Sequence, residues 1–439
     1  MKLKEPAVLL VLLLVLPLFL NCSLTTETAA AQSSPSLYFG VDVGFGGIAA
    51  TEQLIDNISS YTNFFVIGCT NNYNETALNI ISEYVYNKGL TFIVYSDFSR
   101  YPSQQWLADA KKNFGNSFLG IYYFDEPGGK QIDQTDYPII PALNVNLNKT
   151  TYSDVSNWYV GNLSYWLRGQ YSITKNFADP TEYQLFTSDY GLYWYDYEAG
   201  YNTVFAEFTM NYSQQFNVAL CRGAATVQSK DWGVMITWKY TQSPYMENGS
   251  ELLSDMELAY ENGAKYIIVF DSNANYTQNV LTQNIVNGQG GQLAAMYQFW
   301  QYVKANPRTI TTASERTAYV LPAAYGYGFR GPLDRIWGLW LSDNDTTDIG
   351  MSITSLIQML GNNLDIVYPD GSRSVESVGY NNVINWNDPN LIPTPSPTPQ
   401  QTTSSPFHAT SVYFYAIVAC LLVLVAVAAL VLKFRKRSG

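Results

Sequence analysis

The chain contains a single histidine, His408, which lies among prolines, serines and threonines near the C-terminus. The regularly patterned part of the chain therefore has no imidazole to place in a folded site. This excludes Ser-His-Asp and Cys-His catalysis and most zinc sites. Acid/base chemistry in such a chain depends on carboxyl groups.

Basic residues and cysteines are also scarce. The 24 Lys and Arg residues stand against 36 Asp and Glu, and the net charge of −12 argues against a nucleic-acid partner. Outside the hydrophobic ends only Cys69 and Cys221 remain, and they can form one disulfide or stay as two buried thiols. The glycine-rich stretch at 44–47 lacks dinucleotide-binding spacing and no loop has calcium-ligand spacing, so we expect no cofactor and no metal.

The first 31 residues have the layout of a cleavable export signal. Lys2 and Lys4 precede an apolar run at 7–20, and small residues follow at 29–31. An uncleaved anchor is the alternative, although the run is shorter than the roughly 20 residues that cross a bilayer. In both cases the following segment leaves the cytoplasm.

Near the other end, residues 412–432 form an unbroken apolar stretch, followed by a basic tail at 433–439. This pattern predicts a transmembrane helix with its C-terminal tail in the cytoplasm. The preceding segment, 392–411, is rich in Pro, Ser and Thr and is expected to form an extended stalk. We therefore expect a single-pass protein of the cell membrane with an extracellular N-terminal ectodomain. Sequons such as that at Asn162 are compatible with a glycoprotein.

In the ectodomain, short apolar runs rich in β-branched and aromatic residues alternate with helical patterns. This alternation predicts a parallel sheet covered by helices. The expected strands are residues 37–43, 64–67, 91–95, 118–124, 203–208, 233–238 and 266–270. So many strand and helix units favour a (β/α)8-type (TIM) barrel at 36–306 over an open sheet.

Two parts of this interpretation leave alternatives open. Residues 131–183 are irregular and are expected to be helices and loops inserted after the fourth strand. Residues 317–321 can supply the eighth barrel strand or begin a small α/β appendage at 315–390. We favour the appendage, because a helical pattern at 349–360 and a strand pattern at 364–368 follow.

Acidic residues gather at the expected C-terminal ends of these strands, where barrels of this type place their active residues. The catalytic candidates are Glu126, Glu207 and Asp271. Substrate-binding candidates are Asp42, Asp97, Asp125, Trp194, Trp238 and Lys239. Paired carboxyl groups with aromatic neighbours are what sugar hydrolysis requires. The alternative for several of these carboxylates is that they cap the following helix.

The most informative motif is Tyr-Tyr-Phe-Asp-Glu-Pro at 122–127. It resembles the strand-four motif of TIM-barrel glycoside hydrolases, in which the Glu is the acid/base, and this resemblance implies that role for Glu126. The large retaining group places its nucleophilic Glu near strand seven, where Asp271 is expected here. Glu207 is an equal candidate for that role, and the alternative is that Glu207 is an interior residue of the barrel.

Two aromatic clusters accompany these carboxylates. Residues 189–201 contain five tyrosines and one tryptophan, which suit either sugar stacking or a packed insert. Residues 325–340 resemble the joint to the small C-terminal domain of galactosidase-like hydrolases, and we expect packing there. The leading hypothesis is a membrane-anchored glycoside hydrolase-like protein that acts on external glycans, and the alternative is a non-catalytic glycan-binding or structural cell-envelope protein. The sequence does not indicate the oligomeric state.

Overall fold

The computed structural model describes residues 36–68, 74–97, 102–168, 183–273, 275–281, 291–331, 333–369 and 374–389. The predicted export signal, stalk, transmembrane segment and basic tail lie outside these ranges, and so does Cys69. Within the described ranges, no helix combines the length and the apolar composition needed to cross a membrane. Cys221 is a buried free thiol.

Eight parallel strands close into a barrel in chain order. Gly40 in the first strand pairs with Phe64 on one side and with Ile268 on the other, which closes the ring. The predicted (β/α)8 barrel is therefore confirmed. Its strands are β1 (Tyr38–Val43), β2 (Phe64–Ile67), β3 (Thr91–Ser96), β4 (Phe118–Tyr123), β5 (Gln184–Asp189), β6 (Thr203–Phe208), β7 (Asp231–Ile236) and β8 (Tyr266–Asp271).

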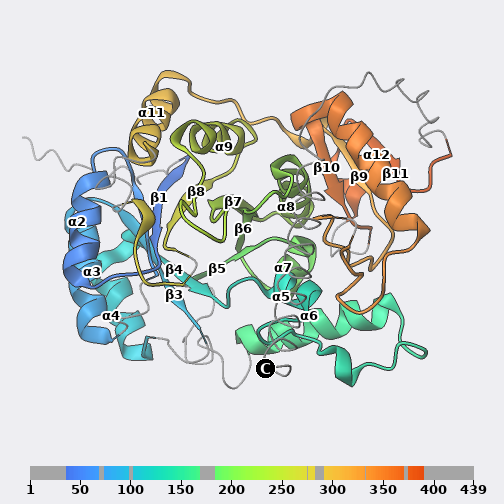
Figure 1. Cartoon of the computed structure of the whole chain (residues 1–439), viewed down its shortest axis with the longest axis horizontal. Coiled ribbons are helices and arrows are strands. Elements are labelled where there is room, and N and C mark those ends of the chain that lie inside the picture. Colours follow the sequence, from blue (N-terminus) through green and yellow to red (C-terminus); the bar gives the residue numbers. More distant parts are fainter. Residues whose placement is uncertain are drawn as a thin grey trace, which may run out of the picture. The chain divides into compact units, whose positions relative to one another are not determined.

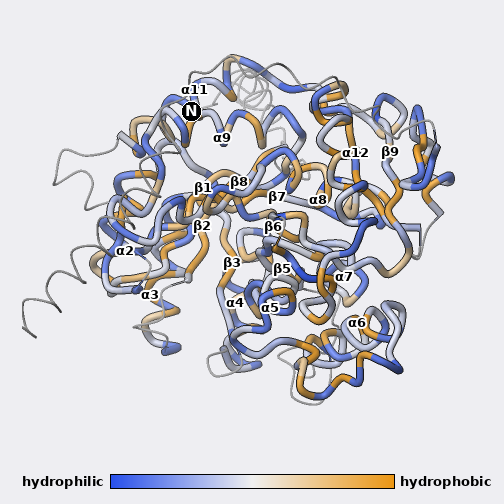
Figure 2. The backbone as a smooth tube through the Cα atoms, turned by 45° about the vertical axis from the view of Figure 1, so that its right-hand side comes forward, coloured by the Kyte–Doolittle hydropathy of each residue, from blue (hydrophilic) through white to orange (hydrophobic). Residues whose placement is uncertain are grey.

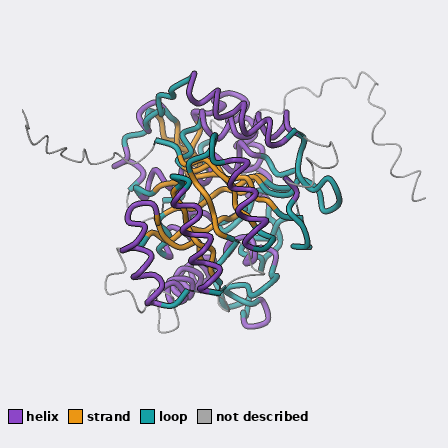
Figure 3. Tube along the Cα trace, turned by 90° about the vertical axis from the view of Figure 1, so that its left-hand side faces the viewer, coloured by secondary structure: helices purple, strands orange, loops and turns teal. Residues whose placement is uncertain are grey.

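Helices follow the strands and surround them (Figures 1 and 3). They are α2 (Ile48–Ile58), α3 (Glu75–Asn87), α4 (Gln104–Phe114), α5 (Pro127–Asp133), α6 (Tyr152–Arg168), α7 (Tyr193–Ala199), α8 (Gln214–Gln228), α9 (Gly249–Glu261) and α11 (Gln292–Ala305). Polar caps fix several starts: Asn74 accepts from the Ala77 amide, and Asn248 forms a capping box with Glu251. Such caps satisfy backbone donors that the first helical turn leaves free.

The barrel interior is filled by large side chains, many of them aromatic. Tyr38 stacks on Tyr266 with ring centroids 4.8 Å apart, and Phe186 lies edge-on to Tyr266 at 5.5 Å. Gly233 provides the necessary room, since a Cβ there would lie 2.6 Å from the Cβ of Tyr266. Figure 2 shows hydrophobic residues along the strands at the centre. This packed layer closes the barrel below its C-terminal mouth.

Strand β5 is absent from the sequence-based prediction. The expected fifth strand, at 203–208, is β6, so the strand that ends at Asp271 is β8 and not strand seven. Strand β5 reads Gln-Leu-Phe-Thr-Ser-Asp, with only two strongly apolar residues, and directly precedes the aromatic stretch at 189–201. Its pairing with β4 and β6 sets its structure more than its own composition does.

A second, three-stranded parallel sheet follows the barrel, in the order β10 (Leu364–Val367), β9 (Thr317–Val320) and β11 (Asn382–Asn385), with α12 (Asn344–Leu360) between β9 and β10. Residues 317–320, one alternative for the eighth barrel strand, lie in this sheet. Helix α8 packs closely on β10, because a Cβ at Gly223 would lie 2.4 Å from the Ile366 carbonyl oxygen. Arg222 also pairs with Asp365 at 2.8 Å across this junction.

Candidate active site

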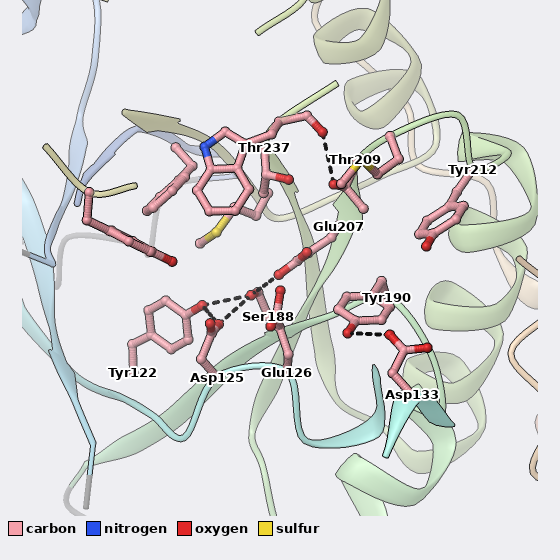
Figure 4. Close-up of a pocket in the computed structure, with 15 residues that line it drawn as sticks. Tyr122, Asp125, Glu126, Asp133, Ser188, Tyr190, Glu207, Thr209, Tyr212 and Thr237 are labelled. Atoms are coloured by element: carbon pink, nitrogen blue, oxygen red, sulfur yellow. Dashed lines mark hydrogen bonds between the residues drawn. The ribbon is translucent and has the colours of Figure 1, made fainter. Parts of the chain in front are cut away.

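The chain turns sharply where β4 ends. Phe124 and Glu126 both adopt left-handed backbone conformations, with φ of 55° and 54°. Such conformations are unfavourable for residues other than glycine, and the surrounding structure must hold them. The Glu126 amide donates to the Ser188 carbonyl at 3.0 Å, and Pro127 starts α5 at once. The turn directs the Glu126 side chain into the barrel mouth (Figure 4).

Asp189, the last residue of β5, anchors this turn. Its buried carboxylate accepts hydrogen bonds from the amides of Gly128 at 2.5 Å and Gly129 at 2.8 Å, which are free donors in the first turn of α5. It also accepts from the Tyr190 and Gly191 amides. Burial raises the pKa of Asp189 to about 6, although these amides favour its charged form. Asp189 therefore fixes the geometry of the Asp-Glu-Pro segment from the neighbouring strand.

A hydrogen-bonded chain of side chains crosses the mouth from β4 to β6. The Ser188 hydroxyl lies 2.5 Å from Glu207 Oε1, 3.0 Å from Asp125 Oδ1 and 2.7 Å from the Tyr122 hydroxyl. Tyr122 also donates to Asp125. The two hydroxyl protons can serve only two of these four contacts at a time. A proton held by one of the carboxyl groups supplies a third donor. This network of side chains can therefore bind a shared proton.

The electrostatics of the mouth favour such a proton. Burial, followed by the charges of Glu126 and Asp125, raises the pKa of Glu207 well above its usual range. Burial and the charge of Asp125 raise the pKa of Glu126 to about 8. Lys130 partly offsets this, because its Nζ lies 3.5 Å from Glu126 Oε2. The charge of Glu126 is thus one cause of the raised pKa of Glu207, so ionisation of Glu126 favours a protonated Glu207.

These side chains surround a cavity of about 230 Å³ at the barrel mouth. Figure 4 shows Glu126 and Glu207 side by side around Ser188, with tyrosine rings on the flanks. The lining residues are Tyr122, Asp125, Glu126, Asp133, Ser188, Tyr190, Glu207, Thr209, Met210, Tyr212, Met235, Thr237, Trp238, Phe270 and Tyr276. Carboxyl oxygens and aromatic faces dominate this wall.

Four of the predicted site residues line this cavity: Asp125, Glu126, Glu207 and Trp238. The Trp238 indole donates to the Ser272 carbonyl at 2.7 Å, which fixes its ring against Phe270. The structure therefore brings together the carboxyl groups from β4 and β6 and one predicted aromatic residue.

Asp271 has a different position. Phe270 lines the cavity, and because neighbouring strand residues face opposite sides, Asp271 faces away from the barrel interior. Its Oδ1 accepts from the Leu281 amide at 2.8 Å, so this carboxyl orders the loop after β8. Asp42 is buried in β1, where burial and the charge of Asp125 raise its pKa. Neither residue is among the described residues that line the cavity.

The other predicted binding residues also lie outside the described cavity lining. Trp194 is buried in α7, with its ring 5.6 Å from that of Tyr368 in the second part of the chain. Lys239 pairs with Glu251 at 2.9 Å. Asp97 lies beyond the end of β3. The packing alternative therefore describes Trp194 better than sugar stacking does.

Several lining residues were not predicted. Ser188 escaped because β5 was missed, and no local signal marks a serine as a link between two carboxyl groups. Tyr190 lies at the edge of the aromatic stretch that was singled out, whereas Tyr212 and Tyr276 are ordinary members of a tyrosine-rich chain. Asp133 ends α5, and only the tertiary structure brings it to the cavity.

Among the described residues, no group of three or more His, Cys, Asp or Glu side chains is arranged to hold a metal ion. The carboxyl groups of the mouth contact hydroxyl groups and Lys130 instead. The fold and the site together define a (β/α)8-barrel protein with a carboxyl-rich, aromatic-walled cavity at the C-terminal ends of its strands.

No protein-family model and no curated protein matches the chain. Solved structures similar to it include the catalytic module of a family 98 glycoside hydrolase from Streptococcus pneumoniae, at 12% identity over 78% of this chain and 67% of that chain, with a TM-score of 0.40. A β-1,4-D-mannanase from Cryptopygus antarcticus has 10% identity over 60% and 89%, with a TM-score of 0.33. A D-psicose 3-epimerase from Clostridium cellulolyticum has 10% identity over 62% and 100%, with a TM-score of 0.32. At these values the similarities identify neither a family nor an activity for this chain.

Proposed function

We propose that the chain is a membrane-anchored, extracellular glycoside hydrolase that acts on cell-surface or environmental glycans. One observation carries the proposal: Glu126 and Glu207, from the ends of two strands, line one aromatic-walled cavity, and the pKa of each is raised. Hydrolysis of a glycosidic bond needs one protonated and one ionised carboxyl group, and a pair that shares a proton supplies both.

Glu126 is the proton donor in this proposal. Its side chain is 28% exposed and can reach the leaving oxygen of a substrate, whereas Glu207 is only 3% exposed. A pKa of about 8 keeps Glu126 protonated at neutral pH. After it gives up its proton, the nearby Lys130 ammonium stabilises the carboxylate. Glu207 is the partner that attacks the sugar or activates water.

Asp271 takes no part in this proposal, since its carboxyl group orders the loop after β8. Four carboxyl groups, those of Asp125, Glu126, Asp133 and Glu207, line the cavity, and none of its described lining residues is basic, so the lining offers no positive charge even with Glu126 protonated. Acidic sugars would be repelled there, because their carboxylates would lie close to carboxyl groups of the protein with no basic side chain between them. We therefore infer that the substrates are neutral glycans.

The test uses full-length protein in detergent, a panel of aryl glycosides with good and poor leaving groups, and neutral polysaccharides. Glu126→Gln is expected to lose about 10²- to 10⁴-fold in kcat/KM on poor leaving groups and much less on dinitrophenyl glycosides, which need no protonation. Glu207→Gln is expected to lose activity on both. Glu261→Gln, on the surface of α9, is the control. Equal losses on both leaving groups for Glu126→Gln would remove it as the acid.

A second candidate function is glycan binding without catalysis. The contact of 3.5 Å between Lys130 and Glu126 favours it, because this pairing favours an ionised Glu126, which cannot donate a proton. A wild-type protein that binds neutral oligosaccharides but cleaves none in the panel would support this alternative.

The location rests on the hydrophobic segment at 412–432 and the export signal at 1–31. A chain that stops after residue 391 is expected to leave the membrane fraction and appear in the medium. A truncated protein that stays in the cytoplasm would overturn the proposed export.

A further inference from the structure

Arg330 lies in the segment that connects β9 to α12, outside the barrel, yet it contacts three residues of the cavity wall. Its guanidinium donates to both carboxylate oxygens of Asp133, from Nη2 at 2.7 Å and from Nη1 at 3.0 Å. Its Cζ lies 5.2 Å from the ring centroid of Tyr190 and 5.7 Å from that of Tyr212. Asp133, Tyr190 and Tyr212 all line the cavity, whereas Arg330 does not.

The three wall residues come from different elements. Asp133 ends α5, Tyr190 follows β5, and Tyr212 precedes α8. The Tyr190 hydroxyl donates to Asp133 Oδ2 at 3.0 Å, and the two tyrosine rings lie 6.3 Å apart. Figure 4 shows these three side chains together on one flank of the cavity, beside Glu126 and Glu207. Arg330 therefore adds a shared charged partner to three side chains that already contact one another.

Arg330 is itself firmly held. Asp334 accepts from its Nη2 at 2.6 Å and from its Nε at 3.0 Å, and the arginine side chain is only 6% exposed. The connecting segment docks on α5, where Gln131 donates to the Trp337 carbonyl at 2.8 Å. A planar guanidinium with two carboxylate partners and two ring faces is a rigid arrangement that lysine cannot reproduce.

The wall retains the chemistry to bind a sugar. A carboxylate has about four acceptor positions, and Arg330 and Tyr190 use three of those on Asp133, which leaves one for a sugar hydroxyl. The tyrosine rings offer apolar faces and hydroxyl groups to a pyranose. The charge of Arg330 is balanced by Asp133 and Asp334, so it does not attract an anion.

We propose that Arg330 is a positioning residue that organises Asp133, Tyr190 and Tyr212 into a binding subsite for a neutral sugar ring next to the reacting carboxyl groups. The segment after the barrel thus takes part in substrate recognition and is more than packing. This inference rests on the proposed glycan specificity of the cavity, but it concerns binding and does not require turnover.

The experiment compares Arg330→Ala and Arg330→Lys with wild type in full-length protein, with a series of neutral oligosaccharides from two to six sugars as probes. Calorimetry gives Kd and hydrolysis gives kcat and KM. Both variants are expected to raise Kd and KM about tenfold, the loss of roughly one good contact, with kcat within threefold and an unchanged pH profile of kcat. Arg308→Lys is the matched control, since Arg308 also lies over a tyrosine ring and binds backbone carbonyls, but neither Arg308 nor this tyrosine, Tyr260, is among the described cavity-lining residues.

Tyr212→Leu serves as the second variant in case the arginine variants do not fold, and it is expected to weaken binding without changing the pH profile. The subsite would be overturned if Arg330→Lys or Tyr212→Leu bound the oligosaccharides with the same Kd as wild type. A fall in kcat at constant KM in these variants would also overturn it. If wild type cleaves no substrate but the variants bind oligosaccharides more weakly than wild type, the subsite stands and only the proposed hydrolase is overturned. Variants that still cleave the substrate and bind it with unchanged Kd would keep the proposed hydrolase and overturn the subsite.

Discussion

Two buried carboxyl groups show how differently this molecule treats negative charge. Asp365, at the junction between the barrel and the second sheet, is fully buried and meets Arg222 at 2.8 Å and Arg316 at 3.0 Å, with a third hydrogen bond from the Tyr380 hydroxyl at 2.9 Å. Glu207, at the barrel mouth, is almost as buried and accepts from the Ser188 hydroxyl. Its charged neighbours, Glu126 and Asp125, are themselves acidic.

The charge of Asp365 therefore stabilises the structure, whereas the charges at the mouth are those that the proposed hydrolysis would use. At the junction Asp365, Arg222 and Arg316 each have a partner of opposite sign, and these ion pairs hold the second sheet against the barrel. At the mouth the charges of Glu126 and Asp125 raise the pKa of Glu207, an arrangement that costs stability and suits a site where a proton is held and released.

The largest expected effect is on activity. Glu207→Gln preserves shape and removes the charge, so kcat/KM should fall by about 10³-fold. The melting temperature should stay the same or rise, because an uncompensated buried carboxyl group is gone. A loss of activity that only follows a loss of folded protein would show that Glu207 is an interior structural residue.

Asp365→Ala should have the opposite signature. Two buried guanidinium groups would lose their shared partner, and breaking such an arrangement costs about 3–5 kcal/mol of unfolding free energy. Denaturant titration measures this change, and kcat of the folded protein should not change. Asp231→Asn, which weakens a half-exposed pair with Lys265, is the control and should cost no more than about 1 kcal/mol. Equal costs for the two variants would contradict the special role of the junction.

The sequence predicted the features that local patterns encode and missed those that depend on contacts between distant segments. Alternating strands and helices gave the barrel, and the Asp-Glu-Pro motif led to Glu126, because both are local patterns. Asp271 ends its strand as predicted, but one missed strand makes that strand the eighth instead of the seventh, and strand ends alone do not tell which face a residue takes. Ser188, Asp133 and Arg330 depend on contacts between distant segments, and no short-range pattern in the sequence encodes these contacts.

The free energy of unfolding should also depend on pH, because Glu126 at the barrel mouth titrates differently in the folded and unfolded states. Glu126 has an ordinary pKa of 4.5 and a folded-state pKa of about 8. Between these values the folded state binds more protons than the unfolded state, so its stability falls as pH rises from about 4.5 to about 8. Glu126→Gln should flatten this slope in melting curves measured across that window, and Glu261→Gln should not. An unchanged slope in Glu126→Gln would show that other groups set the pH dependence.

The smallest effect is expected for Ser188→Ala, which tests the link between the carboxyl groups. The Ser188 hydroxyl stabilises the ionised form of Glu207, so its loss should raise the pKa of Glu207 further. The acidic limb of the pH–rate profile should move to higher pH, and kcat/KM at neutral pH should fall about tenfold, the effect of roughly one charge-assisted hydrogen bond.

Thr187→Val is the matched control for this prediction, because Thr187 neighbours Ser188 on β5 but its hydroxyl donates to the Phe124 carbonyl, away from the carboxyl groups. It should leave the acidic limb in place, even if stability falls. A shift in the same direction for both variants would mean that the strand as a whole sets the pKa of Glu207. A shift in Ser188→Ala alone would show that one hydroxyl controls the charge of a buried glutamate that, unlike Asp365, makes no ion pair with an arginine in the described part of the chain.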